Sequence, residues 1–191
     1  MSRLARLATV GLLALAACSN GADVKSTSGP SESRPQPTRA PTTTFAGATT
    51  PVSTPRTEYR FLTAVRVGAH EGFDRVVFEF ESGVPGYSVS YVNRPITEDG
   101  SGKEVTVAGG AVLAVRLESS SAVDTTGTSL RQTYTGPTRI AASGPVVTEV
   151  VRTGDFEGVL NWVIGARSQA PFHAYTSEGN KLVVDIGATT T

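Results

Sequence analysis

From Tyr59 onward, hydrophobic and polar residues alternate with a period of two, which is the pattern of β-strands with one buried face. The clearest segments are D-R-V-V-F-E-F-E (74–81) and K-L-V-V-D-I (181–186). Their predicted inward residues are Val76, Phe78, Phe80, Leu182, Val184 and Ile186. The residues between them, including Arg75 and Asp185, are predicted to face outward. Further strands are expected at 59–67, 86–92, 103–107, 112–117, 146–152, 159–164 and 171–175.

Clusters of glycine, proline and serine separate these runs, and no amphipathic helix longer than two turns is evident. Many short strands between turn signals predict an all-β fold, an antiparallel β-sandwich of two small sheets. The single tryptophan, Trp162, is in phase with Leu160 and Ile164, so we expect it in the core. Residues 118–132 lack the alternation and are predicted to form a long loop. A weak internal sequence repeat relates Phe73 and its strand to Phe156 and the strand that follows it.

The first 17 residues combine two arginines with an apolar run that is shorter than the roughly 20 residues needed to span a bilayer. This layout predicts a secretory signal peptide at 1–17. Leu15-Ala16-Ala17-Cys18 resembles the lipobox of bacterial lipoproteins, which implies that Cys18 is acylated and becomes the mature N-terminus. Two acyl chains would hold the protein stably on a membrane without a spanning helix. The alternative is an ordinary signal peptide, with Cys18 at this position by chance.

Residues 18–57 are rich in Ser, Thr and Pro, with Phe45 as their only aromatic residue. Such a segment buries too little apolar surface to fold, so it is predicted to be a disordered tether. The folded domain is expected at 58–191. Cys18 is the only cysteine, so this domain has no disulfide and no thiolate zinc site.

The charge balance argues against a nucleic-acid partner. The whole chain has 17 basic and 17 acidic residues, and removal of Arg3 and Arg6 leaves 17 − 2 = 15 basic residues and a formal charge of −2. Nucleic-acid-binding domains are normally strongly basic.

The sequence offers little for catalysis, and no cofactor motif is present. His70 lies in a predicted loop, and His70-Glu71 has no second histidine four residues later to complete a zinc motif. His173 is predicted to face outward from a strand, and no serine occupies a G-x-S-x-G motif. Glu79 and Glu81 share a strand face with Arg75 and are interpreted as a solvated charge ladder, although a glycosidase pair would have the same residue types.

Several segments together resemble one family. These are the lipobox and tether, G-F-D-R-V-V-F-E-F (72–80), G-V-L-N-W-V-I-G-A-R (158–167), P-F (171–172) and K-L-V-V-D-I (181–186). They resemble the AMIN-like domain of bacterial envelope lipoproteins, which is similar to the AMIN module found beside cell-wall amidases. The resemblance implies a β-sandwich on the outer face of the cell membrane with a targeting or binding role, and peptidoglycan is the expected ligand. It carries no residue-level binding motif.

The candidate binding residues are therefore chosen by chemistry. A cell-wall polymer offers carboxylates to arginine and sugar rings to aromatic side chains, which favours Arg94, Tyr134 and Arg139 at predicted strand ends. The alternative is that these three are ordinary surface residues at strand ends, with no role in binding. Two other roles stay open: docking of a second envelope protein at a sheet edge, and transport of a small apolar ligand between the sheets.

Overall fold

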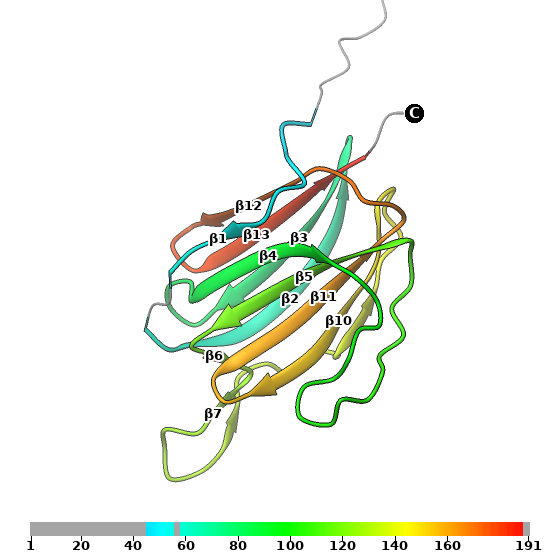
Figure 1. The fold of residues 1–191 in the computed structure, drawn as a ribbon. Helices are drawn as coiled ribbons and strands as arrows, with labels where there is room; N and C mark the ends of the chain where they lie inside the picture. Colours follow the sequence, from blue (N-terminus) through cyan, green and yellow to red (C-terminus); the bar gives the residue numbers. More distant parts are fainter. Residues whose placement is uncertain (1–44, 56–57, 189–191) are drawn as a thin grey trace, which may run out of the picture. The chain divides into compact units, whose positions relative to one another are not determined.

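The computed structural model describes residues 45–55 and 58–188, and it consists of β-strands, turns and loops (Figure 1). The strands are β1 (Val52–Ser53), β2 (Arg60–His70), β3 (Phe73–Phe80), β4 (Gly86–Val92), β5 (Ala111–Glu118), β6 (Ser120–Ser121), β7 (Val123–Asp124), β8 (Arg131–Gln132), β9 (Arg139–Ala141), β10 (Val147–Phe156), β11 (Val159–Ala166), β12 (Phe172–Ser177) and β13 (Lys181–Gly187). Within the described ranges, no helix is long and apolar enough to cross a membrane.

Two sheets pack face to face, which confirms the predicted β-sandwich. One sheet has the order β1-β4-β5-β11-β10-β9, and the other has the order β12-β13-β3-β2-β6. Apart from the parallel contact of β2 with β6, neighbouring strands in these sheets are antiparallel. A separate two-stranded hairpin, β7-β8, projects beyond one end of the sandwich (Figure 1).

The core lies between the sheets, where the period-two pattern places large apolar side chains. All six residues predicted to face inward from 74–81 and 181–186 are at most 1% exposed. Trp162 is fully buried, as predicted, and its indole meets Phe78 and Tyr134 in edge contacts with centroids 6.0 and 5.6 Å apart. These three rings fill the middle of the sandwich, and such edge-to-face pairs add to the gain from burial.

The strand order contains a repeat. Four consecutive strands, β2 to β5, have the same arrangement as the four strands β10 to β13. If each strand is replaced by its counterpart (β2 by β10, β3 by β11, β4 by β12, β5 by β13, and the reverse), the order β12-β13-β3-β2 of one sheet becomes the order β4-β5-β11-β10 of the other. The β2-β3 turn lies between His70 and Phe73, and the β10-β11 turn lies between Phe156 and Val159. Phe73 therefore corresponds to Val159. The weak sequence repeat matches this repeat of strands, but it aligned Phe73 with Phe156 instead of Val159.

Two predicted local structures differ from the fold. Residues 103–107 form no strand and have only an isolated bridge between Thr97 and Glu104. Their loop, 93–110, instead packs on the outer face of the six-stranded sheet and forms a second small core, composed of Ile96, Val107, Val112, Val151 and Val163. The range 118–132 is not one long loop, because it includes the short strands β6, β7 and β8.

Part of the expected tether is folded against the domain. Strand β1 pairs with β4, and Ala48 forms a bridge with Phe172 at the edge of the other sheet. The ring of Phe45 lies 5.9 Å from that of Phe73. The folded body therefore includes residues before 58. The predicted signal peptide, Cys18 and the tether up to residue 44 lie outside the described residues.

Candidate functional site

The outer face of the five-stranded sheet is the main candidate site. Loop 93–110 covers part of the outer face of the six-stranded sheet. On the outer face of the five-stranded sheet, the side chains contact one another and, at one end, the ring of Phe45. Strand register places four rows of residues across β12, β13, β3 and β2. We call this surface the open face; its rows are Ser177-Lys181-Glu79-Ala64, Tyr175-Val183-Val77-Arg66, His173-Asp185-Arg75-Gly68 and Gly187-Phe73-His70.

A fixed guanidinium lies at the centre of the open face. Arg75 donates from Nε and Nη2 to the two carboxylate oxygens of Asp185, at 2.7 and 2.8 Å. Its Nη2 also donates to the hydroxyl of Tyr175 at 3.0 Å. The Asp185 side chain is only 9% exposed, although the sequence pattern predicted simply an outward position. The hydrogen bond to Asp185 is the largest cause of the raised pKa of Arg75, and the bidentate geometry holds the side chain in one orientation.

Stacked aromatic rings flank this arginine. The rings of His173 and Tyr175 lie 4.9 Å apart at the β12 edge, and those of His70 and Phe73 lie 4.8 Å apart beside the β2-β3 turn. The guanidinium of Arg75 lies 5.3 Å from the centre of the Phe73 ring. His173 faces outward as predicted, whereas His70 is the last residue of β2 rather than a loop residue. Flat rings beside a charged fork suit a ligand that has both apolar faces and anionic groups.

Comparison with known proteins places this fold in a family. The family model of the AMIN-like domain matches residues 60–188, which is about two thirds of the chain. The protein belongs to the AMIN-like domain family. No curated protein and no solved structure matches the chain. AMIN-like domains are generally non-catalytic binding modules related to the cell wall, and they occur in envelope and periplasmic proteins.

The three binding residues predicted from sequence lie away from the open face of this AMIN-like domain. Arg94 is exposed, and its Nη2 donates to the carbonyl oxygen of Gly109 at 2.8 Å. Arg139 pairs with Glu149 and donates to the carbonyl oxygen of Thr106 at 2.9 Å. Arg139, in β9, therefore fastens loop 93–110 to the domain, whereas the Arg94 hydrogen bond joins the two ends of that loop. Their role in ligand binding stays a prediction.

The placement predicted for Tyr134 is wrong. Its side chain is only 5% exposed, packs on Trp162, and donates its hydroxyl hydrogen to the carbonyl oxygen of Pro137 at 2.7 Å. Burial raises the pKa of this hydroxyl. The ring belongs to the core, so it offers no surface on which a sugar could stack.

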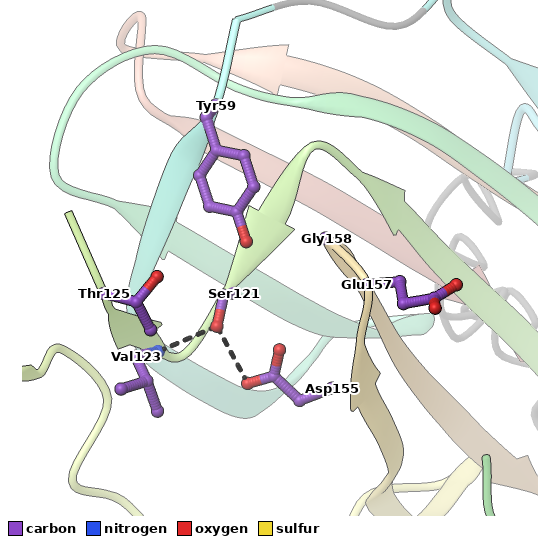
Figure 2. Close-up of a pocket in the computed structure, with 7 residues that line it drawn as sticks. All are labelled: Tyr59, Ser121, Val123, Thr125, Asp155, Glu157 and Gly158. Atoms are coloured by element: carbon purple, nitrogen blue, oxygen red, sulfur yellow. Dashed lines mark hydrogen bonds between the residues drawn. The ribbon is translucent and has the colours of Figure 1, made fainter. Parts of the chain in front are cut away.

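The AMIN-like domain also has a hollow of about 350 Å³ at the end of the sandwich near the β10-β11 turn. Figure 2 shows Tyr59, Ser121 and Asp155 on its wall. Asp155 Oδ2 accepts hydrogen bonds from Ser121 Oγ at 3.2 Å and from the backbone N–H of Ala122 at 2.9 Å. Burial is the main cause of the raised pKa of Tyr59. Because these polar groups bind one another, they hold strand β6 in place and leave little free hydrogen-bonding capacity for a ligand.

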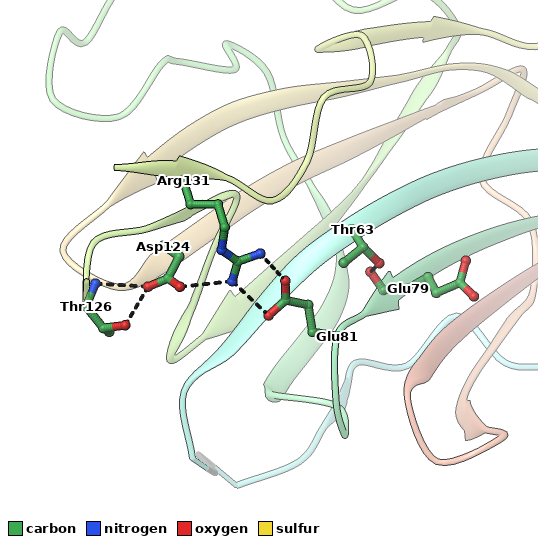
Figure 3. Close-up of polar contacts among 6 residues, drawn as sticks. All are labelled: Thr63, Glu79, Glu81, Asp124, Thr126 and Arg131. Carbon is green, nitrogen blue, oxygen red and sulfur yellow. Dashed lines mark hydrogen bonds and ion pairs between the residues drawn. The ribbon is translucent and has the colours of Figure 1, made fainter. Parts of the chain in front are cut away.

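A second polar cluster fastens the β7-β8 hairpin to the end of β3. Arg131 binds Glu81 with both terminal nitrogens and reaches Asp124 at 2.9 Å (Figure 3). Hydrogen bonds from Thr126, and then from Arg131, lower the pKa of Asp124 to about 2. Glu81 therefore pairs with Arg131, which corrects the predicted ladder of Glu79, Glu81 and Arg75.

Glu79 has a separate set of partners. Its carboxylate pairs with Arg66 at 2.6 Å and with Lys181 at 3.8 Å. Its backbone carbonyl oxygen accepts a hydrogen bond from the Thr63 hydroxyl at 2.9 Å, at the irregularity in β2 (Figure 3). Within the described ranges, no three His, Cys, Asp or Glu residues are grouped as a metal site would require.

Proposed function

We propose that this AMIN-like domain is a non-catalytic module that binds cell-wall peptidoglycan through the open face. The observation that carries the proposal is the bidentate Arg75–Asp185 ion pair at the centre of the open face. Two stacked aromatic pairs flank this ion pair. The family match supports a cell-wall-related binding role.

The chemistry of peptidoglycan matches this face in two ways. Its sugar rings have apolar faces that can stack on exposed aromatic side chains such as His173. Its peptide carboxylates can accept hydrogen bonds from arginine and lysine, and Arg66, Arg75 and Lys181 all lie on this face.

Sedimentation with insoluble, protein-free peptidoglycan tests the proposal. The protein used is the chain from Ser19 to Thr191, which retains every described residue. We expect saturable binding that His173→Ala weakens, because this change removes one ring of the exposed stack. Thr176→Ala, at an exposed position of the same strand, is the matched control. Absence of wall binding, or equal binding by the His173 and Thr176 variants, would refute the assignment of this face.

We further propose that acylated Cys18 anchors the domain at the outer face of the membrane. The support is the lipobox in the sequence, and two acyl chains suffice for stable anchoring. Cys18→Ala should move the protein from the membrane fraction to the soluble exported fraction. Unchanged fractionation of this variant would contradict lipid anchoring.

One observation favours docking of another envelope protein as a second candidate function. Strand β2 has 11 residues, and β6 pairs only with Arg60 and Phe61 at its beginning. Among the described residues, no further strand pairs with the rest of that edge, so an extended segment of a partner could add to the sheet. In-cell crosslinking from Ala69, which is exposed on β2, should then recover one protein repeatedly.

A further inference from the structure

Because of the internal repeat, positions on the outer face of one sheet have equivalent positions on the outer face of the other. Gly68 lies opposite Arg75 in the β2-β3 pair, and Gly154 lies opposite Asn161 in the β10-β11 pair. Both glycines precede an E-G turn by the same number of residues, and the facing residue follows the turn at the same spacing. Gly68 with Arg75 on the open face therefore corresponds to Gly154 with Asn161 on the other sheet.

On the six-stranded sheet, a carboxylate of the chain itself occupies the notch above the glycine. A Cβ atom added at Gly154 would overlap the carboxylate of Asp99, which comes from loop 93–110. Asn161 Nδ2 donates to Asp99 Oδ2 at 2.6 Å, and the backbone N–H of Asp99 donates to the carbonyl oxygen of Thr153 at 2.9 Å. The missing side chain at Gly154 thus makes room for an acidic group beside a hydrogen-bond donor on the neighbouring strand.

On the open face, the corresponding notch has space and a stronger donor. Within the described part of the chain, and apart from the sequence neighbours of Gly68, the atom nearest to a Cβ built on Gly68 is Nε2 of His70, at 3.8 Å. Arg75 directs Nε and Nη2 to Asp185, and its Nη1 has no hydrogen-bond partner among the described residues. Guanidinium-to-carboxylate hydrogen bonds are about twice as strong as neutral ones. A ligand carboxylate beside Gly68 would therefore have a charged donor in Arg75, as Asp99 has a neutral amide donor in Asn161.

From this correspondence we propose that the notch formed by Gly68, Arg75 and His70 binds a carboxylate group of the cell-wall polymer. The inference rests on the proposed function and adds the chemical class of the group that is recognised. Arg75 Nη1 donates to the ligand carboxylate, while Asp185 keeps the guanidinium in position. Gly68 provides the space, as Gly154 does for Asp99.

Gly68→Ala is the decisive variant. The φ angle of Gly68 lies outside the left-handed region, and the added methyl group has room, so the fold should be retained. The methyl group would occupy the place that the carboxylate needs. Gly127→Ala, an exposed loop glycine whose added Cβ would also be free of close contacts, is the matched control.

The wall-binding assay uses two preparations, native peptidoglycan and peptidoglycan whose carboxyl groups have been converted to amides. We expect Gly68→Ala to bind native wall about tenfold less tightly, as the loss of one charge-assisted hydrogen bond implies. Amidation of the wall should weaken binding by the unmodified protein at least as much, and it should weaken binding by Gly68→Ala less, because that variant has already lost the notch contact. Equal affinity of Gly68→Ala and the unmodified protein for native wall would overturn the notch assignment and leave the wall-binding function intact.

A titration with N-acetylalanine, followed by two-dimensional amide NMR, separates failure of the notch from failure of the proposed function. The small carboxylate should shift the Gly68 amide resonance in the unmodified protein, and in the Gly68→Ala variant it should leave the amide resonance at the substituted position unchanged. If N-acetylalanine shifts Gly68 but the protein binds no wall, the notch assignment stands with a carboxylate from another source and the proposed function fails. If neither probe binds, both proposals fail.

Discussion

Substitution of Asp74 tests how much a single buried carboxylate that connects the two sheets contributes to stability. Asp74 lies in β3, is 1% exposed, and accepts the backbone N–H groups of Val146 and Val147 at 2.8 and 2.7 Å, both through Oδ2. Its other oxygen has no partner among the described residues. Gly144 passes so close to this carboxylate that a Cβ there would overlap it. The side chain thus ties the beginning of β10 and the residue before it to the opposite sheet.

The hydrogen-bond geometry sets the size of the effect. Asp74→Ala leaves two buried N–H groups without an acceptor, and each costs about 1–3 kcal/mol. Removal of the unpaired oxygen from the interior offsets part of this, so we expect a loss of about 3 kcal/mol, a large share of the roughly 5–15 kcal/mol of a typical domain. Asp74→Asn can keep both bonds through its one amide oxygen, so its loss should be about 1 kcal/mol.

Equilibrium unfolding in urea measures both variants, and the fluorescence of Trp162, the only tryptophan, reports the transition because its ring is fully buried in the fold. Glu71→Ala, in the exposed turn after β2, is the control and should leave the midpoint unchanged. Faster amide hydrogen exchange at Val146 and Val147 should accompany the loss in Asp74→Ala. A loss below about 1 kcal/mol for this variant, or equal losses for the Ala and Asn variants, would refute the reasoning.

Three further predictions follow from the packing and the charges. Trp162→Ala should destabilise the domain by about 4 kcal/mol, because it empties the centre of the core; urea unfolding followed by circular dichroism measures this. Gly154→Ala should expel Asp99 from its notch, which would appear as faster amide exchange and proteolysis of loop 93–110, and retention of the loop would contradict the packing. The pKa of Asp124 is lowered to about 2, so its contribution to stability is complete above its ordinary pKa of 3.8 and is lost as the pH falls through about 2. Thermal unfolding of Asp124→Asn should therefore differ from that of the unmodified protein near pH 5 and converge with it near pH 2.

The sequence could predict which residues form the core, because the period of two is a property of the strand itself. Val76, Phe78 and Leu182 face inward in the structure as the alternation required. The same local signal failed at 103–107, where apolar residues alternate but serve to cover a sheet rather than to join one. Alternation identifies a buried face, and it does not identify the element that buries it.

The candidate site depends on information that the sequence holds only indirectly. Arg75 and Asp185 are 110 residues apart in the chain, and their pairing requires the register of β3 against β13. Tyr134 looked like a surface residue beside a turn, yet the return of its segment over the core buries it. Each residue type was visible in the sequence, but the neighbours that give it a role were not.

By itself, the sequence determined the all-β class and the inward face of the main strands, because both depend on residues that are close together in the chain. Export and lipidation also rest on a short local signal, and they stay predictions. The tertiary structure alone decided which sheet face is covered by loop 93–110 and which is left open. It also decided that Gly154 accommodates a carboxylate from that loop, while Gly68 has no such neighbour among residues 45–55 and 58–188. These features arise where strands and loops distant in the chain pack together, so strand register and loop path control them rather than local composition.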